Sequence, residues 1–492
     1  MTVVHDSVER LDVEAVNSKE RRALYAARVK IFPKRVSGVF RKLKWWVMLV
    51  TLAIYYITPW LRWDRGEHVP DQAVLVDIAN RRFYFFFIEI WPQEFYYVAG
   101  LLIMAGIGLF LVTSTVGRAW CGYTCPQTVW VDLFMAVERW IEGDRNARIK
   151  LDGSAWTPAK LTKRLAKHAV WLVIALFTGG AWIFYFADAP ALIVSLVTLN
   201  APLVAYSTVA ILTATTYVFA GFMREQVCTY MCPWPRIQSA MLDEDSLVVT
   251  YNDWRGEPRS RHQKKAAAQG QKVGDCVDCN ACVAVCPMGI DIRDGQQLEC
   301  ITCALCIDAC NTVMDKVGKP RGLISYSTLR DYEASASGQQ AVTNWRSFIR
   351  PRTLVYLLVW SLIGFGMLIV LTMRDRLDVS VLHDRNPVFV QLSDGAIRNG
   401  YTIKILNMQA EPRRFRLEIA GVAGATMTVA GSDAPGSSSA LVDIGADKLR
   451  AIKVYVRIPQ ANVVSGRSKL KFTVSDTAGS ETSTYEANFE AP

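Results

Sequence analysis

The sequence predicts a multidomain protein that combines five membrane-spanning α-helices, an inserted cysteine-rich α+β domain and a C-terminal β-sandwich. Three observations predict this fold class: long apolar segments between basic loops, cysteines confined to tight groups, and a change near Asp378 to short alternating stretches. The 492 residues are too many for one hydrophobic core. Hydrophobic residues make up 51% of the chain, charged residues only 20%, and the mean hydropathy is +0.17. Such values are typical of membrane spans that alternate with polar segments.

Five segments are long and apolar enough to cross a bilayer. Aromatic residues lie near their ends, as expected at membrane interfaces. The apolar stretch Phe83–Trp91 is short and contains Glu89, so we expect an interfacial or re-entrant segment there. The predicted spans are Trp45–Leu61, Tyr96–Val116, Ala169–Phe186, Leu203–Phe222 and Leu354–Met373.

The distribution of basic residues predicts the orientation of these spans. The amino-terminal segment and the loops before the third and fifth spans are rich in Lys and Arg, whereas Asp188–Ala201 contains neither. By the positive-inside rule the amino terminus is cytoplasmic and the carboxyl terminus lies outside. All twelve cysteines then lie in the cytoplasm, where thiols stay reduced. The formal charge of +10 is explained by basic loops near anionic lipid, and no basic stripe indicates nucleic-acid binding.

The strongest motif is a doubled run of cysteines with the spacing C-x2-C-x2-C-x3-C. Bacterial ferredoxins use this run to hold two 4Fe–4S clusters, and the fourth cysteine of each run ligates the other cluster. A proline follows the first run, and Asn311 takes that place after the second. We therefore assign one cluster to Cys276, Cys279, Cys282 and Cys310, and the other to Cys300, Cys303, Cys306 and Cys286.

Zinc and disulfides are the alternatives to iron–sulfur clusters for these eight cysteines. Structural zinc sites use two separated cysteine pairs, and disulfide scaffolds belong to short secreted chains. Neither fits a doubled run in a long membrane protein. The acidic residues around the motifs are expected on the solvated surface: Asp278, Asp291, Asp308 and Asp315.

A second motif, C-x3-C-P, occurs as Cys121 with Cys125 after the second span and as Cys228 with Cys232 after the fourth. Proline suits the first position of a helix, so each pair precedes one, and the helix after Pro126 is predicted to be amphipathic. Four soft thiolates at equal depth could form one metal-binding and catalytic site for Cu(I), zinc or another iron–sulfur centre. The alternative is that they are small buried residues near helix ends.

The segment from Asp378 onward reads as an immunoglobulin-like β-sandwich without a cysteine bridge. Its predicted strands are Tyr401–Met408, Arg414–Ile419, Thr426–Val429, Ile452–Ile458 and Lys469–Val474.

The predicted domain boundaries follow from these motifs. They are 1–44 for a basic cytoplasmic segment, 45–223 for four spans with the first C-x3-C-P pair, 224–352 for the cytoplasmic region with the second pair and the ferredoxin-like domain, 353–374 for the fifth span, and 375–492 for the outer domain.

Together these motifs closely resemble the FixG/RdxA/CcoG family of bacterial cytochrome c oxidase accessory proteins. The resemblance covers nearly the whole chain, and the order of its motifs is specific. It rests on Ile31–Lys34 in the basic leader, Gly117–Pro126, Cys228–Trp234, the doubled cysteine run and the outer β-domain.

The resemblance implies a role in maturing cbb3-type cytochrome c oxidase, with reduction of Cu(II) to Cu(I) for copper insertion as the expected activity. It also implies the bacterial inner membrane as the location, with the immunoglobulin-like domain in the periplasm. The implied partners are membrane lipid and oxidase assembly factors or copper chaperones and transporters. The sequence identifies no electron donor and leaves homo-oligomer formation open.

Two other functions fit the same motifs. One is a quinol-linked electron conduit to a periplasmic reductase, like the polyferredoxin subunits that serve periplasmic nitrate reduction, although those lack the outer β-domain. The other is a non-redox assembly scaffold whose clusters are structural. Clusters that never change redox state with any donor would favour the scaffold.

Overall fold

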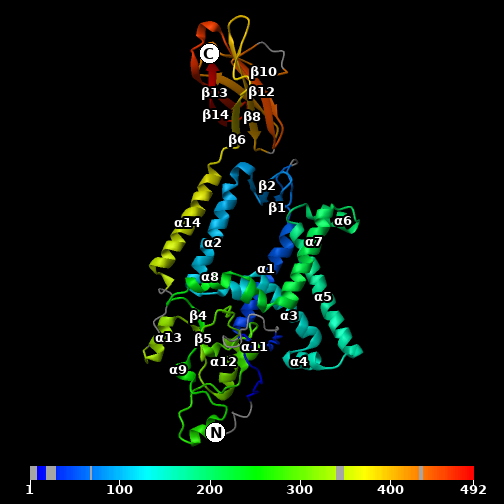
Figure 1. Cartoon of the computed structure of the whole chain (residues 1–492), viewed down its shortest axis with the longest axis vertical. Coiled ribbons are helices and arrows are strands. Elements are labelled where there is room, and N and C mark those ends of the chain that lie inside the picture. Colours follow the sequence, from blue (N-terminus) through cyan, green and yellow to red (C-terminus); the bar gives the residue numbers. More distant parts are fainter. Residues whose placement is uncertain (1–7, 18–28, 67–68, 340–347, 410, 432–435) are drawn as a thin grey trace. The chain divides into compact units, whose positions relative to one another are not determined.

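The computed structural model describes residues 8–17, 29–66, 69–339, 348–409, 411–431 and 436–492. Parts of the predicted basic amino-terminal segment, 1–7 and 18–28, lie outside the described residues. The chain forms two compact units. The first contains 1–61 and 72–367, and the second contains 62–71 and 368–492 (Figure 1).

Four helices of the described chain are long and apolar enough to cross a membrane: Pro92–Val116, Pro158–Ile183, Leu203–Met223 and Pro351–Thr372. They correspond to the second to fifth predicted spans and contain α2 (Tyr96–Val116), α5 (Pro158–Ile183), α7 (Leu203–Thr216) with the π-helical turn η6 (Tyr217–Met223), and α14 (Pro351–Thr372). The first predicted span is not among them. It falls in α1 (Val39–Ile57), whose first two turns carry Arg41, Lys42 and Lys44, so its uncharged part is short.

A small antiparallel sheet lies between α1 and α2 along the chain. It consists of β1 (Val74–Asp77), β2 (Arg82–Phe85) and β3 (Ile88–Ile90). The predicted interfacial or re-entrant segment is therefore a β-hairpin, in which Phe83 pairs with Ile90. Glu89, which interrupts its apolar pattern, forms an ion pair with Arg82 at 3.3 Å.

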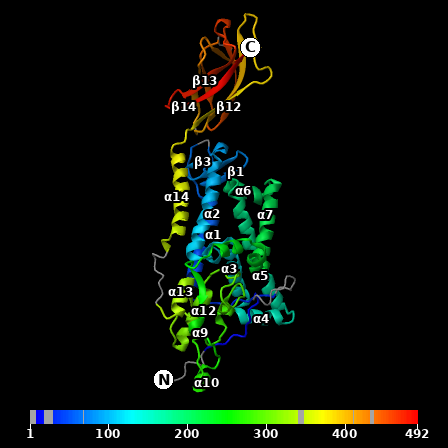
Figure 2. The ribbon, with the colours of Figure 1, turned by 60° about the vertical axis from the view of Figure 1, so that its left-hand side comes forward.

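The cysteine-rich insert is an α+β domain, as predicted. Its two-stranded antiparallel sheet, β4 (Val248–Tyr251) with β5 (Ile324–Ser327), packs with α11 (Ala281–Val285) and α12 (Leu305–Val317) around one apolar core. In the first unit these elements lie at one end of the long helices, and β1–β3 with α6 (Ala189–Val197) lie at the other (Figures 1 and 2).

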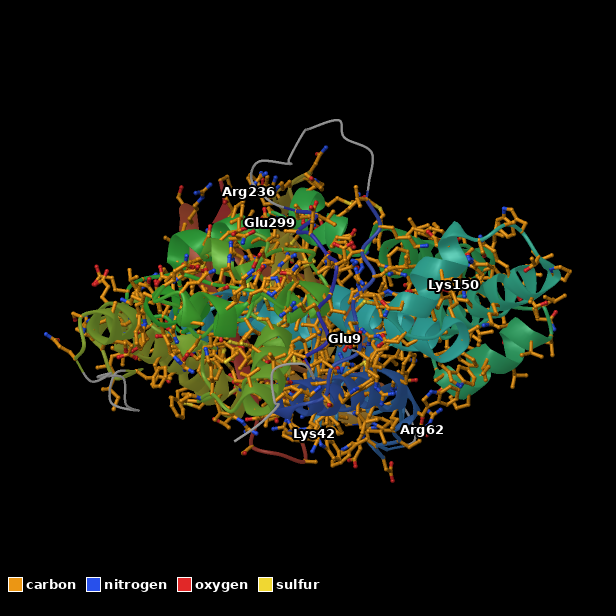
Figure 3. All side chains as sticks on the ribbon, turned by 90° about the horizontal axis from the view of Figure 1, so that it is seen from below. Glu9, Lys42, Arg62, Lys150, Arg236 and Glu299 are labelled. Atoms are coloured by element: carbon orange, nitrogen blue, oxygen red, sulfur yellow. The ribbon has the colours of Figure 1, made fainter. Side chains whose placement is uncertain are left out.

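The remaining helices of the first unit have between 4 and 17 residues. Charged side chains such as Lys150 and Arg236 extend outward from them (Figure 3). The helices are α3 (Pro126–Glu142), α4 (Arg145–Gly153), α8 (Trp234–Met241), α9 (Asp253–Gly256), α10 (Gln263–Ala268) and α13 (Leu329–Ala336).

The predicted solvent exposure of two acidic residues in the insert is wrong. Asp308 is only 5% exposed, because it accepts hydrogen bonds from the backbone N–H groups of Phe40 (3.3 Å) and Arg41 (2.8 Å). It thus satisfies free donors at the start of α1. Asp291 is 8% exposed and is held by Arg293, whose Nε donates to it at 2.9 Å.

The second unit contains two antiparallel sheets that share one core. Alternate residues of the strands point inward, and Tyr401, Phe415 and Phe472 are fully buried. This is the predicted β-sandwich, with further strands before Tyr401, between Val429 and Ile452, and after Val474 that the sequence pattern did not indicate. One sheet has the order β10 (Thr426–Val429), β12 (Leu449–Ile458), β8 (Ile397–Asn407), β6 (Leu377–His383), with β7 (Val390–Gln391) on β8; the other is β11 (Ser439–Ile444), β9 (Arg413–Ala420), β13 (Gly466–Asp476), β14 (Thr482–Ala491).

Candidate functional site

The two ferredoxin-like cysteine runs have the same backbone shape. In the first, the residues on either side of Cys279 have positive φ, 49° at Asp278 and 57° at Asn280. In the second, Thr302 (50°) and Ala304 (60°) repeat this pattern around Cys303. Residues other than glycine adopt this conformation rarely and only where the surrounding structure imposes it. Each loop therefore turns tightly around its middle cysteine.

The fourth cysteine of each run lies beside the other run. Burial, together with the nearby Cys279 and Cys276, raises the pKa of Cys310 to about 12. Burial and the neighbouring Cys303 likewise raise the pKa of Cys286 to about 12. A small cavity is lined by members of the second predicted ligand set, Cys286, Cys300, Cys303 and Cys306, together with Cys282. The structure thus brings together the residues of each predicted crossed set.

The arrangement of these thiols fits multinuclear clusters. Within the described chain, no three His, Cys, Asp or Glu side chains gather closely enough to hold a single metal ion. Yet the thiols of each set lie close enough to influence one another electrostatically. Buried thiols with raised pKa values ionise only when a positively charged group binds them. Several thiolates around a cube of iron and sulfide meet both conditions.

Arg293 is a further residue of this site that the motif search missed. Its guanidinium donates to Asp278 (2.8 Å), Asn280 (2.8 Å) and Asp291 and is 7% exposed. It therefore ties the first cysteine loop to the segment between the runs and places a positive charge beside Cys282. The sequence did contain a signal for this residue, because Arg293 is the only basic residue between the two cysteine runs.

Substituting Cys286 tests the crossed ligand sets. Cys286→Ala is expected to damage mainly the cluster held by Cys300, Cys303 and Cys306, because Cys286 lies with those thiols. Electron paramagnetic resonance of the reduced protein, together with iron analysis, measures each cluster separately. Loss confined to the cluster of the first run would refute the assignment. Cys310→Ala is the matched variant and should produce the reciprocal loss.

The two C-x3-C-P motifs fold into the same local structure. Each is a π-helical turn, η5 (Trp120–Thr124) and η7 (Val227–Met231), followed by a cysteine with extended backbone and a helix that starts at or next to the proline. The backbone N–H of Cys125 bonds to the Trp120 carbonyl at 2.9 Å, and that of Cys232 bonds to the Val227 carbonyl at 2.8 Å. The repeated motif in the sequence is therefore a repeat in structure.

The structure brings the four cysteines of these motifs together. Burial, together with the nearby Cys125, Cys121 and Cys232, raises the pKa of Cys228 to about 12. Burial also raises the pKa of Cys121 to about 11, although Arg118 opposes this shift. The Cys121 Sγ donates to the Oε1 of the fully buried Gln238 at 3.0 Å. Four neighbouring thiols of this kind are soft ligands, although no three of them lie close enough together in the described chain to hold a single ion as they stand.

The first C-x3-C-P turn lies directly on the second ferredoxin-like loop. A Cβ on Gly122 would be 2.7 Å from the Ile301 carbonyl oxygen, so only glycine allows this approach. The Tyr123 hydroxyl donates to the Cys303 carbonyl at 3.2 Å, and Arg118 donates to the carbonyl of Leu298. Cys121 and Cys303 belong to one apolar cluster. The turn that carries Cys121 and the loop that carries Cys303 are therefore in direct contact.

Buried ion pairs on α3 hold the segment that precedes the second C-x3-C-P motif. Glu138 is 2% exposed and pairs with Arg148 (2.9 Å) and Arg224 (2.7 Å). Burial by itself would raise the pKa of Glu138, but Arg224, Lys167 and Arg148 together hold it at about 2. Arg224 has a positive φ of 42° and stands four residues before Cys228. The ion pair therefore fixes a strained residue beside the second motif.

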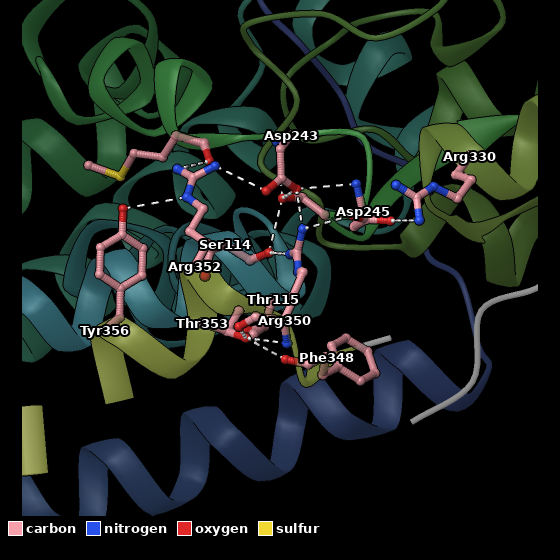
Figure 4. Close-up of polar contacts among 12 residues, drawn as sticks. Ser114, Thr115, Asp243, Asp245, Arg330, Phe348, Arg350, Arg352, Thr353 and Tyr356 are labelled. Carbon is pink, nitrogen blue, oxygen red and sulfur yellow. Dashed lines mark hydrogen bonds and ion pairs between the residues drawn. The ribbon is translucent and has the colours of Figure 1, made fainter. Parts of the chain in front are cut away.

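A second ion-pair network anchors α14 beside this site (Figure 4). Arg350 and Arg352, at the start of α14, bond to Asp243 at 2.7 and 3.0 Å. Arg350 also donates to the carbonyl of Ser114 near the end of α2. Asp243 follows α8, which begins beside the second C-x3-C-P motif. These bonds join two candidate spans to the segment that carries Cys232.

Comparison with protein families matches most of the chain. A 4Fe-4S dicluster domain family matches residues 223–329, which include the doubled run and the second C-x3-C-P motif. A 4Fe-4S binding domain family matches residues 98–145 around the first motif. The family of the IG-like fold at the C-terminus of FixG matches residues 367–492.

Full-length relatives are also similar to this chain. It is 62% identical to the nitrogen fixation protein FixG of Rhizobium meliloti, over 99% of this chain and 97% of that protein. It is 54% identical to protein RdxA of Cereibacter sphaeroides, over 93% of this chain and 96% of that protein. Protein RdxB of the same organism is 54% identical, over 93% and 95% of the two chains.

Proposed function

Because this chain belongs to the FixG/RdxA/RdxB family of membrane iron–sulfur proteins in electron transfer, we propose that it reduces Cu(II) to Cu(I) during assembly of cbb3-type cytochrome c oxidase. In this proposal, the cysteines of the ferredoxin-like insert would hold two 4Fe–4S clusters that supply single electrons, and the four thiols of the C-x3-C-P motifs would bind the Cu(II) that accepts them. Copper is the substrate, and the site lies at the inner face of the bacterial inner membrane.

The observation that carries the proposal is the contact between Gly122–Tyr123 and Ile301–Cys303. It places the thiols of the C-x3-C-P motifs against the loop of the second predicted cluster. Clusters of this type pass electrons singly, which matches the single electron that converts Cu(II) to Cu(I). Thiolates prefer Cu(I), so binding it more tightly than Cu(II) makes the reduction more favourable.

The expected partners follow from this role. Copper chaperones or transporters would deliver and receive the metal, and oxidase assembly factors would use it. The match of the 4Fe-4S binding domain family to 98–145 favours a second candidate for the four thiols, a third iron–sulfur cluster that would itself reduce copper.

Metal analysis combined with a reductase assay tests the proposal. Full-length protein reduced with dithionite and freed of excess reductant should convert Cu(II) to Cu(I), measured with a Cu(I)-specific chelator, while its iron–sulfur absorbance returns. Eight irons per chain with bound copper would support a copper site at the thiols, and twelve irons would support a third cluster. If dithionite reduced the clusters but they never passed electrons to Cu(II), the proposal would be refuted. That result would favour a non-redox assembly scaffold.

We further propose that α1 also crosses the membrane, which would place the C-terminal domain in the periplasm. The start of α1 bonds to Asp308 in the ferredoxin-like insert. Near its end, Tyr55 donates to the carbonyl of Thr178 at 2.7 Å and accepts on its own carbonyl a bond from Tyr185 (3.0 Å). Thr178 and Tyr185 lie near the C-terminal end of α5, a candidate span. The start of α1 is therefore bonded to the ferredoxin-like insert, and its other end is bonded to the C-terminal end of α5.

Reporter fusions test this orientation. A reporter active only outside the cytoplasm should work when fused after Asp378 and fail when fused near Gly270, because five crossings separate the termini. Immunoblots must show equal amounts of both fusions. Equal activity of the two fusions would contradict the five-span topology.

A further inference from the structure

A cavity of about 1150 Å³ lies among α1, α3, α5, α6 and α7. Two of these helices, α5 and α7, belong to candidate membrane spans, so the cavity lies at membrane depth. Its walls are almost entirely apolar, and several are aromatic: Tyr56, Trp60, Phe177, Phe184 and Tyr206. Ligand pockets usually measure about 300–1000 Å³, so this cavity has room for a ring with part of a long apolar tail.

One hydroxyl of this cavity has an unmet hydrogen bond. Thr213 lines the cavity and is 9% exposed, and its Oγ1 has no hydrogen-bond partner among the described residues. Threonines in helices commonly bond to a carbonyl of the preceding turn, as Thr208 does to Val204 at 2.7 Å. A buried hydroxyl without a partner is costly. A ligand with a polar atom at this position would remove that cost, whereas a lipid acyl chain would not.

A second polar pair stands at the wall of the cavity nearest the cysteine motifs. The hydroxyl of Tyr217, which lines the cavity, bonds to Nδ1 of His168 at 2.9 Å. The neighbouring Lys167 pairs with Glu142 at 3.0 Å. Phenol, imidazole and carboxylate groups can each pass on a proton. The cavity therefore adjoins a route by which a proton could leave the apolar interior.

We propose that this cavity binds an isoprenoid quinol, which supplies the electrons for copper reduction. The aromatic walls suit the flat ring, the apolar volume suits the isoprenoid tail, and Thr213 suits a ring oxygen. On oxidation both O–H bonds of the quinol break, and it becomes a quinone. Its two electrons pass one at a time to oxidised iron–sulfur centres, and its two protons leave through the Tyr217 side. This proposal depends on the proposed function in one respect only, which is that Cu(II) is the final electron acceptor.

The wall of the cavity is joined to the C-x3-C-P thiols. Tyr217 begins η6, which leads through Arg224 to Cys228. The side-chain amide of Gln127, two residues after Cys125, donates to the carbonyls of Phe219 (3.0 Å) and Arg224 (3.2 Å). The same short segment therefore borders the cavity on one side and carries a thiol of the proposed redox site on the other.

Gly180 allows the cavity to be filled without disturbing other contacts. It lines the cavity, and a Cβ placed on it would have no atom of the described residues within 4 Å. Gly180→Leu should therefore occupy the space of the ligand. Gly106→Leu is a matched control, since Gly106 lies in α2 outside the cavity and its Cβ would also meet nothing within 4 Å. Thr213→Val removes the unpartnered hydroxyl and keeps the shape of the side chain.

The experiment follows reduction of the iron–sulfur absorbance of full-length protein in nanodiscs after addition of decylubiquinol or a menaquinol analogue. Wild type and Gly106→Leu should be reduced at the same rate, and Gly180→Leu at least about tenfold more slowly. Thr213→Val should raise the half-saturating quinol concentration about 2- to 13-fold, the worth of one hydrogen bond. Dithionite should reduce all four proteins equally.

Two outcomes would overturn the proposal. One is that quinol fails to reduce the wild type while dithionite succeeds, with lipid found as the retained occupant by mass spectrometry. The other is that Gly180→Leu is reduced by quinol as fast as Gly106→Leu. The proposed function is tested separately. Quinol-reduced protein that does not reduce Cu(II) would refute that function and leave the quinol site standing.

Discussion

Replacing Cys121 and Cys125 together by alanine is expected to lower Cu(II) reduction by more than about 100-fold, since loss of outer-shell partners of a metal already costs about 10- to 100-fold. The two thiols lie beside Cys228 and Cys232, and the remaining pair would offer only two soft ligands. The two clusters of the ferredoxin-like insert should remain reducible by dithionite, because their eight cysteines are intact. The Cu(I)-chelator assay and iron analysis measure the two effects separately.

Two further variants make this result specific. Cys228→Ala with Cys232→Ala should give the same loss, because the structure places the two motifs in equivalent turns. Met231→Leu is the matched control within the second motif, since Met231 is 52% exposed. The variant removes a thioether that could be a soft ligand and leaves the four thiols intact. Its activity should stay within about twofold of wild type, as expected for a surface substitution. If the Cys121/Cys125 variant reduced Cu(II) at the normal rate, copper would bind elsewhere.

Glu138→Gln is expected to lower the free energy of unfolding by about 3–5 kcal/mol, the cost of breaking a buried ion pair by removing one partner. Arg148 and Arg224 would then keep buried positive charges without their partner. Glu9→Gln is the control, because Glu9 is 58% exposed in its pair with Lys34, and exposed pairs contribute about 0–1 kcal/mol. Denaturation of the purified protein in detergent, followed by circular dichroism, measures both variants.

The same substitution should change how stability depends on pH. The folded protein holds the pKa of Glu138 at about 2, below the ordinary value of about 4.3. A depressed pKa contributes stability that is present above about pH 4.3 and is lost as pH falls toward about 2. Wild type should therefore lose more stability than Glu138→Gln between about pH 5 and pH 3. Equal losses would show that Glu138 is not ionised in the folded protein.

The cysteine motifs and the apolar spans could be predicted because they depend on local spacing. A C-x2-C-x2-C loop needs only neighbouring residues to surround a cluster, and a membrane span needs only a continuous apolar run. The β-sandwich was predictable from alternation in strands such as β8 and β9, whereas the edge strands β11 and β14 expose more side chains and alternate less clearly. The first predicted span is not among the four candidate spans, because its helix α1 carries Arg41, Lys42 and Lys44 in its first two turns.

Four features could be recognised in the sequence alone: the ligand types, the doubled run, the repeated C-x3-C-P motif and the apolar spans. The tertiary fold was needed to place Gly122 against Ile301, to pair Glu138 with Arg224 and to bury Asp308 at the start of α1. It was also needed to bury the Thr213 hydroxyl beside an apolar cavity, where no described residue bonds to it. Spacing along the chain reports contacts within a few residues. The contacts named above instead join residues that are far apart in sequence. The free energy of each contact depends on burial, which exists only in the packed fold.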